Sequence, residues 1–369
     1  MQRVAVPLGG RSYAVLIEHG LVGRAGDLLA RFAREGRLVV VSDEQVWSAQ
    51  GCRLVEGLAP IRVEAVLVPP GEASKSWSGL AALVERLLAL GVGRGDHLIA
   101  FGGGVVGDLA GFAAAIVKRG CGYVQLPTSL LAQVDSSVGG KTAINSGSAK
   151  NAVGVFHQPA LVLIDPDCLD TLPDRHMRAG YAEIVKYALI EDEGFFEWLE
   201  GNAGAVLARE LRALESAIAH SVAGKAAIVA ADERDLDGRR ALLNLGHSFG
   251  HALEAETGFS DRLLHGEAVA VGIALAFRMS AQRGLCAAAD AARVEAHLRK
   301  AGLPASLAEA GLNGPAEALA DHMLRDKKAN GGEVKLILAR GIGHAFVDRG
   351  TGRRELASFL ASQLGRPIP

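Results

Sequence analysis

A chain of 369 residues, with 49% hydrophobic and 22% charged residues, is long enough for about two globular domains with substantial buried cores. Its formal net charge of -2, without any run of lysine or arginine, argues against a nucleic-acid groove and against binding to an anionic membrane. The longest apolar run, residues 268–277, is too short to span a bilayer, and residues 1–10 lack the pattern of an export signal. We therefore expect neither nucleic acid nor a membrane as a partner.

The cysteines give a second exclusion. Cys52, Cys121, Cys168 and Cys286 lie far apart and form no CxxC pair. This spacing argues against a zinc ribbon, a redox motif and a disulfide framework. Reduced thiols in a cytoplasmic protein are the interpretation that fits best.

Short β-rich runs alternate with helical patterns in the first part of the chain. The predicted strands are residues 13–17, 37–41, 62–68, 97–101, 123–126 and 161–165. The predicted helices between them are residues 21–34, 44–58, 77–90 and 106–118. This alternation predicts a Rossmann-like α/β domain, with a mainly parallel sheet and helices on its faces.

Two features at the ends of predicted strands suit a nucleotide. Asp43 stands where an acidic side chain would meet a ribose in a dinucleotide fold, although an acid there also caps a helix. Residues 102–107, GGGVVG, join a strand to a helix, and the backbone N–H groups of such a turn favour a phosphate. The run lacks the ordered G-x-G-x-x-G, so a tight packing turn is the alternative. A second turn, residues 69–75, faces the same ligand or is a plain loop.

A segment rich in glycine and serine, residues 127–158, follows the predicted strand 123–126. Its sequence Gly139-Gly-Lys-Thr142 resembles the end of a Walker A loop, but Asp135 stands where the first glycine would be, so the motif fails. A lysine after glycines still suits a phosphate as a point charge. We interpret Lys141 and Lys150 as anion binders, with a solvated loop as the alternative.

The pattern becomes helical after the predicted strand 161–165. The predicted helices are residues 178–190, 195–199, 205–231, 241–256, 267–283, 288–301 and 315–325. We place a domain boundary near residues 160–172, so that residues 1–165 form the α/β nucleotide-binding domain and residues 166–369 form an all-α domain. An active site is expected in the cleft between two such domains.

Histidines and a carboxylate in the helical part suggest a metal site. His247 and His251 are four residues apart on one face of a predicted helix, and His265 begins the next apolar helix. Catalytic zinc commonly takes three protein ligands, so two histidines would need a further partner such as a carboxylate. Glu183 and Lys186 share one face of an apolar helix, where burial would require such a partner. Hydrogen-bonded core histidines and a surface ion pair are the alternatives.

Seven segments, taken in order, carry a resemblance to a known family. They are PGEASK at 70–75, GGGVVGDLAGFAAA at 102–115, LPTSLLAQVDSSVGGKT at 126–142, RAGYAEIVKYALI at 178–190, DERDLDGRRALLNLGHSFGHALE at 232–254, LLHGEAVAVG at 263–272 and DKK at 326–328. Together they resemble the 3-dehydroquinate synthases, sugar-phosphate cyclases of the shikimate pathway that leads to aromatic amino acids. So many ordered matches are far more specific than any single motif.

The resemblance implies a lyase that uses NAD and a divalent metal, Zn²⁺ or Co²⁺, and that forms a homodimer. In the family's reaction, 3-deoxy-D-arabino-heptulosonate 7-phosphate is oxidised at C5, loses phosphate, is reduced again, opens, and closes by an aldol step to 3-dehydroquinate. By matching positions, the metal ligands are Glu183, His247 and His265. This replaces the pair His247 and His251 suggested by spacing, and makes His251 a substrate or proton-transfer residue.

The resemblance also implies a set of NAD-binding residues and a set of substrate-binding and catalytic residues. Asp43 joins the first set because of its expected contact with the ribose. The NAD set is Asp43, Gly71, Glu72, Lys75, Gly104, Val105, Val106, Gly107, Asp108, Thr128, Ser129, Lys141, Lys150, Cys168, Leu169, Asp170 and Thr171. The substrate and catalytic set is Asp135, Lys141, Lys150, Asn151, Lys186, Lys225, Asp235, Arg240, Asn244, His251, one of Lys327 and Lys328 (we choose Lys328), and Arg119 acting across the dimer interface.

Three positions depart from the family pattern. Asp235 stands where the family usually has Glu, Ser129 replaces a Thr, and Ala149 stands where Gly is usual. The first shortens a carboxylate near the substrate and so bears on rate and substrate choice. The alternatives that remain are another sugar-phosphate cyclase, a related polyol dehydrogenase and a non-catalytic NAD-sensing module.

Overall fold

The structure, a computed structural model, describes residues 1–147, 149–236, 238–325 and 333–365. The chain divides into two compact units. The first, here called the sheet unit, comprises Met1–Pro173 and Leu211–Arg234; the second, the helical unit, comprises Asp174–Glu210 and Asp235–Pro369. Within the described ranges, none of the helices combines the length and the hydrophobicity that crossing a membrane requires.

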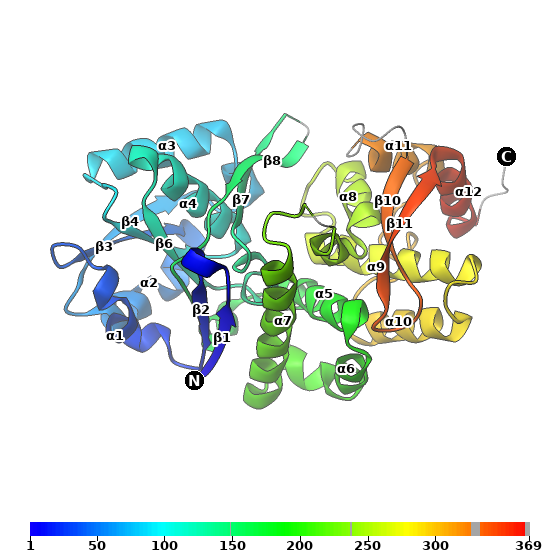
Figure 1. The fold of residues 1–369 in the computed structure, drawn as a ribbon, viewed down its shortest axis with the longest axis horizontal. Helices are drawn as coiled ribbons and strands as arrows, with labels where there is room; N and C mark the ends of the chain where they lie inside the picture. Colours follow the sequence, from blue (N-terminus) through cyan, green and yellow to red (C-terminus); the bar gives the residue numbers. More distant parts are fainter. Residues whose placement is uncertain (148, 237, 326–332, 366–369) are drawn as a thin grey trace. The chain divides into compact units, whose positions relative to one another are not determined.

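A seven-stranded sheet forms the centre of the sheet unit, in the order β1-β2-β9-β6-β5-β3-β4 (Figure 1). Its strands are β1 (Gln2–Val6), β2 (Tyr13–Ile17), β3 (Arg37–Asp43), β4 (Arg62–Val68), β5 (His97–Gly102), β6 (Gly122–Pro127) and β9 (Leu161–Ile164). Every pairing is parallel except that of β1 with β2. The predicted mainly parallel sheet is therefore confirmed, and β1 is the one strand of it that the sequence analysis lacks.

Helices cover both faces of this sheet, because alternate residues of each strand point to opposite sides. They are α1 (Ala25–Leu29), α2 (Glu44–Leu58), α3 (Trp77–Ala89) and α4 (Gly104–Ile116). Val39 and Val41 of β3 belong to the core with α3 and α4, whereas Leu38 and Val40 belong to the core with α1 and α2. The helix predicted over residues 21–34 is instead α1 between two short 3-10 turns.

A β-hairpin replaces the irregular segment that the sequence suggests after Pro127. Strands β7 (Lys141–Ser146) and β8 (Ala149–Phe156) pair antiparallel, beginning with Lys141 opposite Phe156. Ile144 is fully buried in the core beneath α3 and α4. At Gly154 a Cβ atom would lie 2.1 Å from the Thr142 carbonyl oxygen, so the glycine that suggested a loop here permits close strand pairing.

Helix α7 (Leu211–Ala231) belongs to the sheet unit, whereas the sequence analysis assigned it to the helical domain. The predicted helix 205–231 is in fact broken, because Arg209 takes a positive φ of 61° after α6 (Glu193–Leu207) ends. Helix α7 then packs on β1, β2 and the π-turn η6 (Ala132–Ser136). Its partner β1 is absent from the predicted elements, so the pattern gave no sign of this packing.

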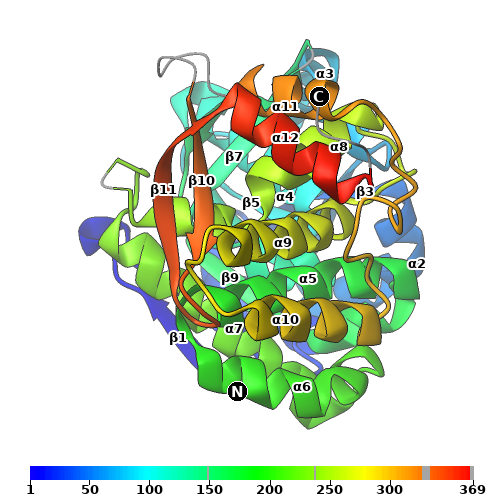
Figure 2. The same ribbon diagram turned by 90° about the vertical axis from the view of Figure 1, so that its right-hand side faces the viewer.

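The helical unit contains seven helices in its described residues. They are α5 (Asp174–Glu191), α6, α8 (His247–Glu256), α9 (His265–Gln282), α10 (Ala288–Lys300), α11 (Ala316–Arg325) and α12 (Arg353–Gln363). Figure 2 shows α9 and α10 side by side, with a two-stranded ribbon of β10 (Glu333–Ala339) and β11 (Ala345–Gly352) against α9. The prediction of a helical C-terminal domain is confirmed, but the all-α composition expected for it is wrong, because the ribbon is part of this unit. Leu336, Ile337, Leu338 and Ala339 of β10 are all buried, so this part of the strand is covered on both faces.

Candidate functional site

Glycines set the spacing of three helices in the helical unit. A Cβ atom at Gly266 would lie 1.8 Å from the Ala179 carbonyl oxygen, so α9 and α5 touch backbone to backbone. A Cβ atom at Gly272 would lie 2.0 Å from the carbonyl oxygen of Gly246, which brings α9 equally close to the start of α8. Gly246 also has a positive φ of 79°. The predicted single helix 241–256 is therefore a 3-10 turn, η8 (Arg240–Asn244), followed by α8, which begins at His247.

Three potential metal ligands meet where these helices touch. Glu183 lies on α5, His247 is the first residue of α8, and His265 is the first residue of α9. The Oε1 atom of Glu183 is 3.7 Å from His247 Nε2 and 3.5 Å from His265 Nε2. The ligand atoms of the three residues all lie within 4.8 Å of one another, compared with about 3.3 Å for two atoms bound tetrahedrally to one zinc ion.

Each imidazole has a hydrogen-bond partner behind it. His247 Nδ1 is 3.2 Å from the Leu245 carbonyl oxygen, and His265 Nδ1 is 3.0 Å from Oε2 of Glu254. In a neutral imidazole, a protonated Nδ1 that donates in this way leaves the lone pair of Nε2 facing Glu183. Metal-bound histidines in proteins characteristically have such a partner, which fixes the tautomer and the orientation of the ring.

The charges around the two histidines differ. Burial lowers the pKa of His247 to about 3, which keeps this imidazole neutral. Burial also lowers the pKa of His265, but the carboxylates of Glu254 and Glu183 outweigh this effect and raise the pKa to about 9. Two carboxylates around one imidazole favour a positive charge at this point, which either a proton or a metal cation can supply.

Lys186 also contacts Glu183. Its ammonium group is 2.6 Å from the Oε2 atom, and both side chains are only 1% exposed. The pair is thus buried, as the apolar helix suggested, and is not a surface ion pair. Because Oε2 faces Lys186, Oε1 is the oxygen turned toward the two histidines.

His251 lies beside this group without joining the pair that its spacing suggested. Its ring centroid is 5.5 Å from that of His247 and 6.1 Å from that of His265. In the described part of the chain, the groups able to hold a metal are Glu183 with His247 and His265, and His251 with Glu254 and His265. Neither contains both His247 and His251. Arg240 is buried at the start of η8, and Asn244 is exposed at its end.

In the sheet unit, the glycine-rich turn begins α4 as predicted. Gly103 is the N-cap and gives no side-chain cap to the first turn, so the backbone N–H groups of Gly104, Val105 and Val106 are directed outward along the helix axis. A Cβ atom at Gly104 would lie 3.0 Å from Ser136 Oγ. Gly107 and Asp108 follow in the same helix.

The turn at residues 70–75 is joined to α4 by a buried ion pair. Gly71 has φ 90° and ψ 169°, a conformation essentially restricted to glycine. Lys75 is 3% exposed, and its Nζ atom donates to Oδ2 of Asp108 at 2.6 Å. Burial lowers the pKa of Lys75, but the carboxylates of Asp108 and Glu72 outweigh it, so the pKa lies above its usual value.

The turn at residues 168–171 is held by α2. Gln50 donates through Nε2 to the Cys168 carbonyl oxygen at 2.8 Å and to Thr171 Oγ1 at 2.7 Å. Cys168 and Leu169 are buried, while Asp170 is exposed. At the start of the same helix, Asp43 accepts a hydrogen bond from the Val46 N–H at 2.9 Å, which is the capping role weighed against its ribose role.

The remaining residues of the two predicted sets are spread over several elements. Thr128 and Ser129 follow β6, the former buried and the latter half-buried. Lys225 of α7 donates to the carbonyl and side-chain oxygens of Asp135. Lys141, Lys150 and Asn151 lie on the hairpin, Arg119 is exposed after α4, and Asp235 has a positive φ of 59°. Lys327 and Lys328 lie outside the described residues.

One residue beside the candidate metal ligands was not singled out by the sequence analysis. Glu254, which is 3% exposed, contacts His265 from α8 and belongs to the second metal-capable group. It stands three residues after His251, hence on the same helix face, and an acid on the face that carries the two histidines was the available signal.

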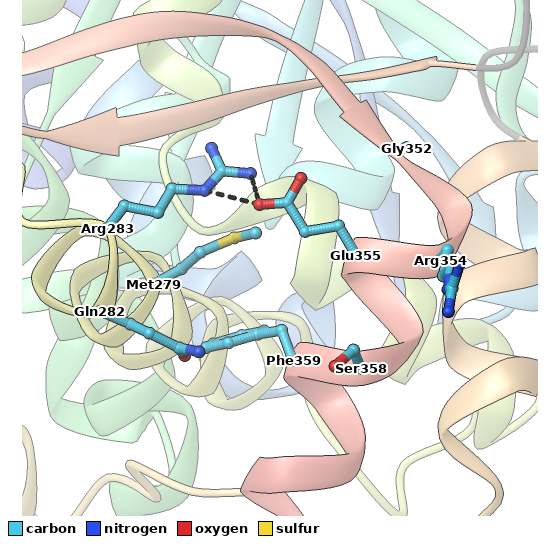
Figure 3. Close-up of a pocket in the computed structure, with 8 residues that line it drawn as sticks. All are labelled: Met279, Gln282, Arg283, Gly352, Arg354, Glu355, Ser358 and Phe359. Carbon is cyan, nitrogen blue, oxygen red and sulfur yellow. Dashed lines mark hydrogen bonds and ion pairs between the residues drawn. The ribbon is translucent and has the colours of Figure 1, made fainter. Parts of the chain in front are cut away.

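A pocket of about 590 Å³ in the helical unit lies elsewhere (Figure 3). It is lined by Met279, Gln282, Arg283, Gly352, Arg354, Glu355, Ser358 and Phe359. The guanidinium of Arg283 is bound to the carboxylate of Glu355 across it. None of the predicted site residues lines this pocket.

Two family models together match residues 65–329 of the chain. A family model described as 3-dehydroquinate synthase N-terminal matches residues 65–179, and one described as 3-dehydroquinate synthase C-terminal matches residues 180–329. The chain is 52% identical to 3-dehydroquinate synthase of Zymomonas mobilis over 365 residues, 98% of this chain and 96% of that one. It is 54% identical to 3-dehydroquinate synthase of Caulobacter vibrioides over 367 residues, 98% and 99% of the two chains.

A solved structure supports the same relationship. The 2-epi-5-epi-valiolone synthase of Streptomyces hygroscopicus, with NAD⁺ and Zn²⁺ bound, matches this chain with a TM-score of 0.88. The two are 30% identical, and the match covers 100% of each chain.

Proposed function

Because the chain belongs to the 3-dehydroquinate synthase family, we propose that it converts 3-deoxy-D-arabino-heptulosonate 7-phosphate to 3-dehydroquinate and phosphate in the shikimate pathway. The observation that carries the proposal is the meeting of Glu183, His247 and His265 at one junction of three helices, with a hydrogen-bond acceptor behind each imidazole. An NAD-sensing module would not need such a donor set.

We assign Glu183, His247 and His265 as the residues that hold Zn²⁺ or Co²⁺. One carboxylate and two imidazoles are a donor set that catalytic zinc uses, with a further position open to substrate. The ion, when bound, supplies Lewis-acid polarisation of substrate oxygens. Glu254 and the Leu245 carbonyl hold the two imidazoles in their orientation, and both are contacts that the chain already makes.

We assign the NAD site to the strand ends of the sheet unit. The N–H groups at the start of α4 are suited to the pyrophosphate, and the turns at residues 70–75 and 168–171 with Thr128 and Ser129 supply the other contacts. NAD, when bound there, would supply reversible hydride transfer at C5 of the substrate, without net release of NADH. The Lys75–Asp108 ion pair keeps the turn at residues 70–75 attached to α4.

Cationic residues are assigned to the phosphate and the carboxylate of the substrate. They are Lys141, Lys150, Lys186, Lys225 and Arg240, accompanied by Asp135, Asn151, Asp235 and Asn244. Asp135 fixes the ammonium group of Lys225, and Glu183 fixes that of Lys186, so these two cations are already oriented. Positioning of this kind supplies much of the rate in a reaction whose leaving phosphate can take the proton itself. His251 is assigned to proton transfer at the substrate.

We further propose a homodimer in which Arg119 acts in the partner's site, and a cytoplasmic location. Support for the first is the exposure of Arg119 at the end of α4 together with its match to the family pattern. Support for the second is that all four cysteines are free. Measurement of the molecular mass in solution tests the dimer, and an Arg119→Ala variant that retains full activity would contradict the role of Arg119.

Phosphate release from 3-deoxy-D-arabino-heptulosonate 7-phosphate by the purified chain tests the proposed reaction. Release should require NAD, should stop after chelation, should resume on addition of Zn²⁺ or Co²⁺, and should yield 3-dehydroquinate without net NADH. Absence of release from a chain that binds both NAD and zinc would contradict the proposal. The structural match to a valiolone synthase then makes other sugar phosphates the second substrates to try, with Asp235→Glu as the first variant. Net NADH from a polyol would indicate a dehydrogenase instead.

A further inference from the structure

Arg175 makes an unusually complete set of contacts for a half-exposed side chain. It is the second residue of α5, and its guanidinium donates through Nε and Nη2 to the two carboxylate oxygens of Glu267, each at 2.7 Å. It also donates through Nη1 to the Asp261 carbonyl oxygen at 2.8 Å and through Nη2 to that of Arg262 at 3.1 Å. One side chain thus holds both the loop before α9 and the first turn of α9.

The hydrogen bonds of Arg175 bear on the start of α9, the helix that begins at His265. Glu267 accepts a hydrogen bond from the Leu264 N–H at 2.8 Å, which caps the helix, and the first helical residue is His265. The first turn of a helix frays more readily than its interior, because its N–H groups lack partners within the helix. An imidazole at that position has a defined location only if the turn is held from outside.

Arg175 also connects the start of α9 to α5, the helix that carries Glu183. Arg175 and Glu183 are on the same helix, α5, and between them Ala179 touches Gly266, the second residue of α9. The start of α9 is therefore fixed to α5 at two points, one through Arg175 and one through the backbone. These points precede the ligand Glu183 along α5 and flank the ligand His265 on α9.

We propose that Arg175 is a positioning residue. By its hydrogen bonds to Glu267 and to the loop at residues 261–262, it holds His265 at the distance from Glu183 that one metal ion requires. The proposal rests on the metal role of these residues in the proposed function. Arg175 does not touch the metal ligands; it acts through the first turn of α9.

The chain offers a matched control for an ordinary ion pair. Arg293 of α10 donates through Nε and Nη2 to both oxygens of Glu200 on α6, at 2.8 Å and 2.6 Å. Its side chain is 35% exposed, compared with 42% for Arg175. Both pairs have the same forked geometry and lie in the helical unit, but Arg293 holds no helix that begins with a metal ligand.

Zinc affinity of the full chain, measured by chelator competition without NAD or substrate, is the first test. Arg175→Met keeps most of the side-chain stem and removes the guanidinium. It should weaken zinc binding about tenfold or more, the usual range for losing a residue that supports a metal ligand, whereas Arg293→Met should change it by less than about twofold. Glu267→Gln retains an acceptor for Leu264 and should cause a smaller loss. Native affinity in Arg175→Met, or an equal loss in Arg293→Met, would overturn the proposal.

Hydrogen exchange of the zinc-free chain is the second test. Arg175→Met should speed exchange at the first amides of α9 that bond within the helix, beginning at Ala268, while Arg293→Met should leave them unchanged. If these amides are as well protected from exchange in Arg175→Met as in the unaltered chain, the positioning role of Arg175 is overturned, whatever the activity of the variant. An unaltered chain that binds zinc but releases no phosphate would contradict the proposed reaction without contradicting the positioning role of Arg175. The two failures are therefore distinguishable.

Discussion

The two units prepare their ligand sites in different ways. In the sheet unit, the assigned nucleotide contacts are backbone groups and short turns where parallel strands end, as at the start of α4. In the helical unit, the assigned metal contacts are side chains, two of which are the first residues of their helices. A site made from backbone follows from the order of strands and helices. A site made from side chains depends on how closely the helices approach.

Glycine serves opposite purposes in the two units. Gly103 and Gly104 leave the N-terminal amides of α4 uncovered by side chains. Gly266 and Gly272 instead bury backbone against backbone, because a Cβ atom at either would overlap a carbonyl oxygen of a neighbouring element.

The largest effect is expected from His265→Ala. Loss of one of three ligands should remove the metal and lower turnover by at least about a thousandfold, since polarisation of the substrate is lost. The sheet unit should keep its NAD affinity. Metal content, phosphate release and calorimetric NAD titration measure the three quantities. Substantial turnover in metal-free buffer would refute the metal assignment.

Gly266→Ala should have the next largest effect. The new methyl group would lie 1.8 Å from the Ala179 carbonyl oxygen, and neither backbone can yield easily. We expect a loss of roughly 3 kcal/mol or more in the free energy of unfolding, together with weaker zinc binding, because α5 and α9 must separate. Chemical denaturation and zinc titration measure both.

Gly201→Ala provides the control for that substitution. Gly201 lies in α6 and has no heavy atom within 4 Å of the added Cβ position. Higher helix propensity should stabilise this variant by about 0.5–1 kcal/mol without a change in zinc affinity. If both variants were equally stable, close approach of the helices would not explain the site.

Much of the sheet unit could be predicted because its signals are local. Residues 62–68 and 44–58 were predicted with the bounds that β4 and α2 have, since apolar runs and helical periodicity report directly on strands covered by helices. The hairpin of β7 and β8 was not predicted. Its glycines and serines suggest a loop, and only its packing beneath α4 makes it a strand pair.

The helical unit could be predicted as helices but not as a site. The spacing of His247 and His251 favoured a pair on one helix face, yet His247 opens α8 after the break at Gly246, and its neighbours come from α5 and α9. Contacts between helices far apart in sequence leave no periodic signal. The choice of Glu183 with His247 and His265 came from family resemblance, and it stays a prediction until a ligand is measured.

Acid should weaken the helical unit through a histidine outside the metal group. Burial lowers the pKa of His297 to about 4, and its Nε2 lies 2.9 Å from the Tyr181 hydroxyl. The unfolded chain takes up a proton near pH 6.5, the ordinary value, whereas the folded chain resists it until about pH 4. The stability from the neutral imidazole is therefore complete above pH 6.5 and declines below it, by up to about 1.4 kcal/mol per pH unit. A His297→Gln variant should show a shallower decline when denaturation is followed across this range; an identical slope would contradict the assignment.

An effect confined to nucleotide binding is expected from Gly104→Ala in the sheet unit. The added methyl group would lie 3.0 Å from Ser136 Oγ, at the first residue of α4, where the pyrophosphate is assigned. We expect NAD affinity to fall about tenfold, or about 1.4 kcal/mol, because the helix amides are no longer freely approached. Stability should hardly change, since alanine is the better helix former, and zinc affinity should stay native. Calorimetric titration of the variant with NAD and with zinc separates the two units. Native NAD affinity in this variant would contradict the assignment of the pyrophosphate to the start of α4. A simultaneous loss of zinc affinity would mean that the two sites are coupled.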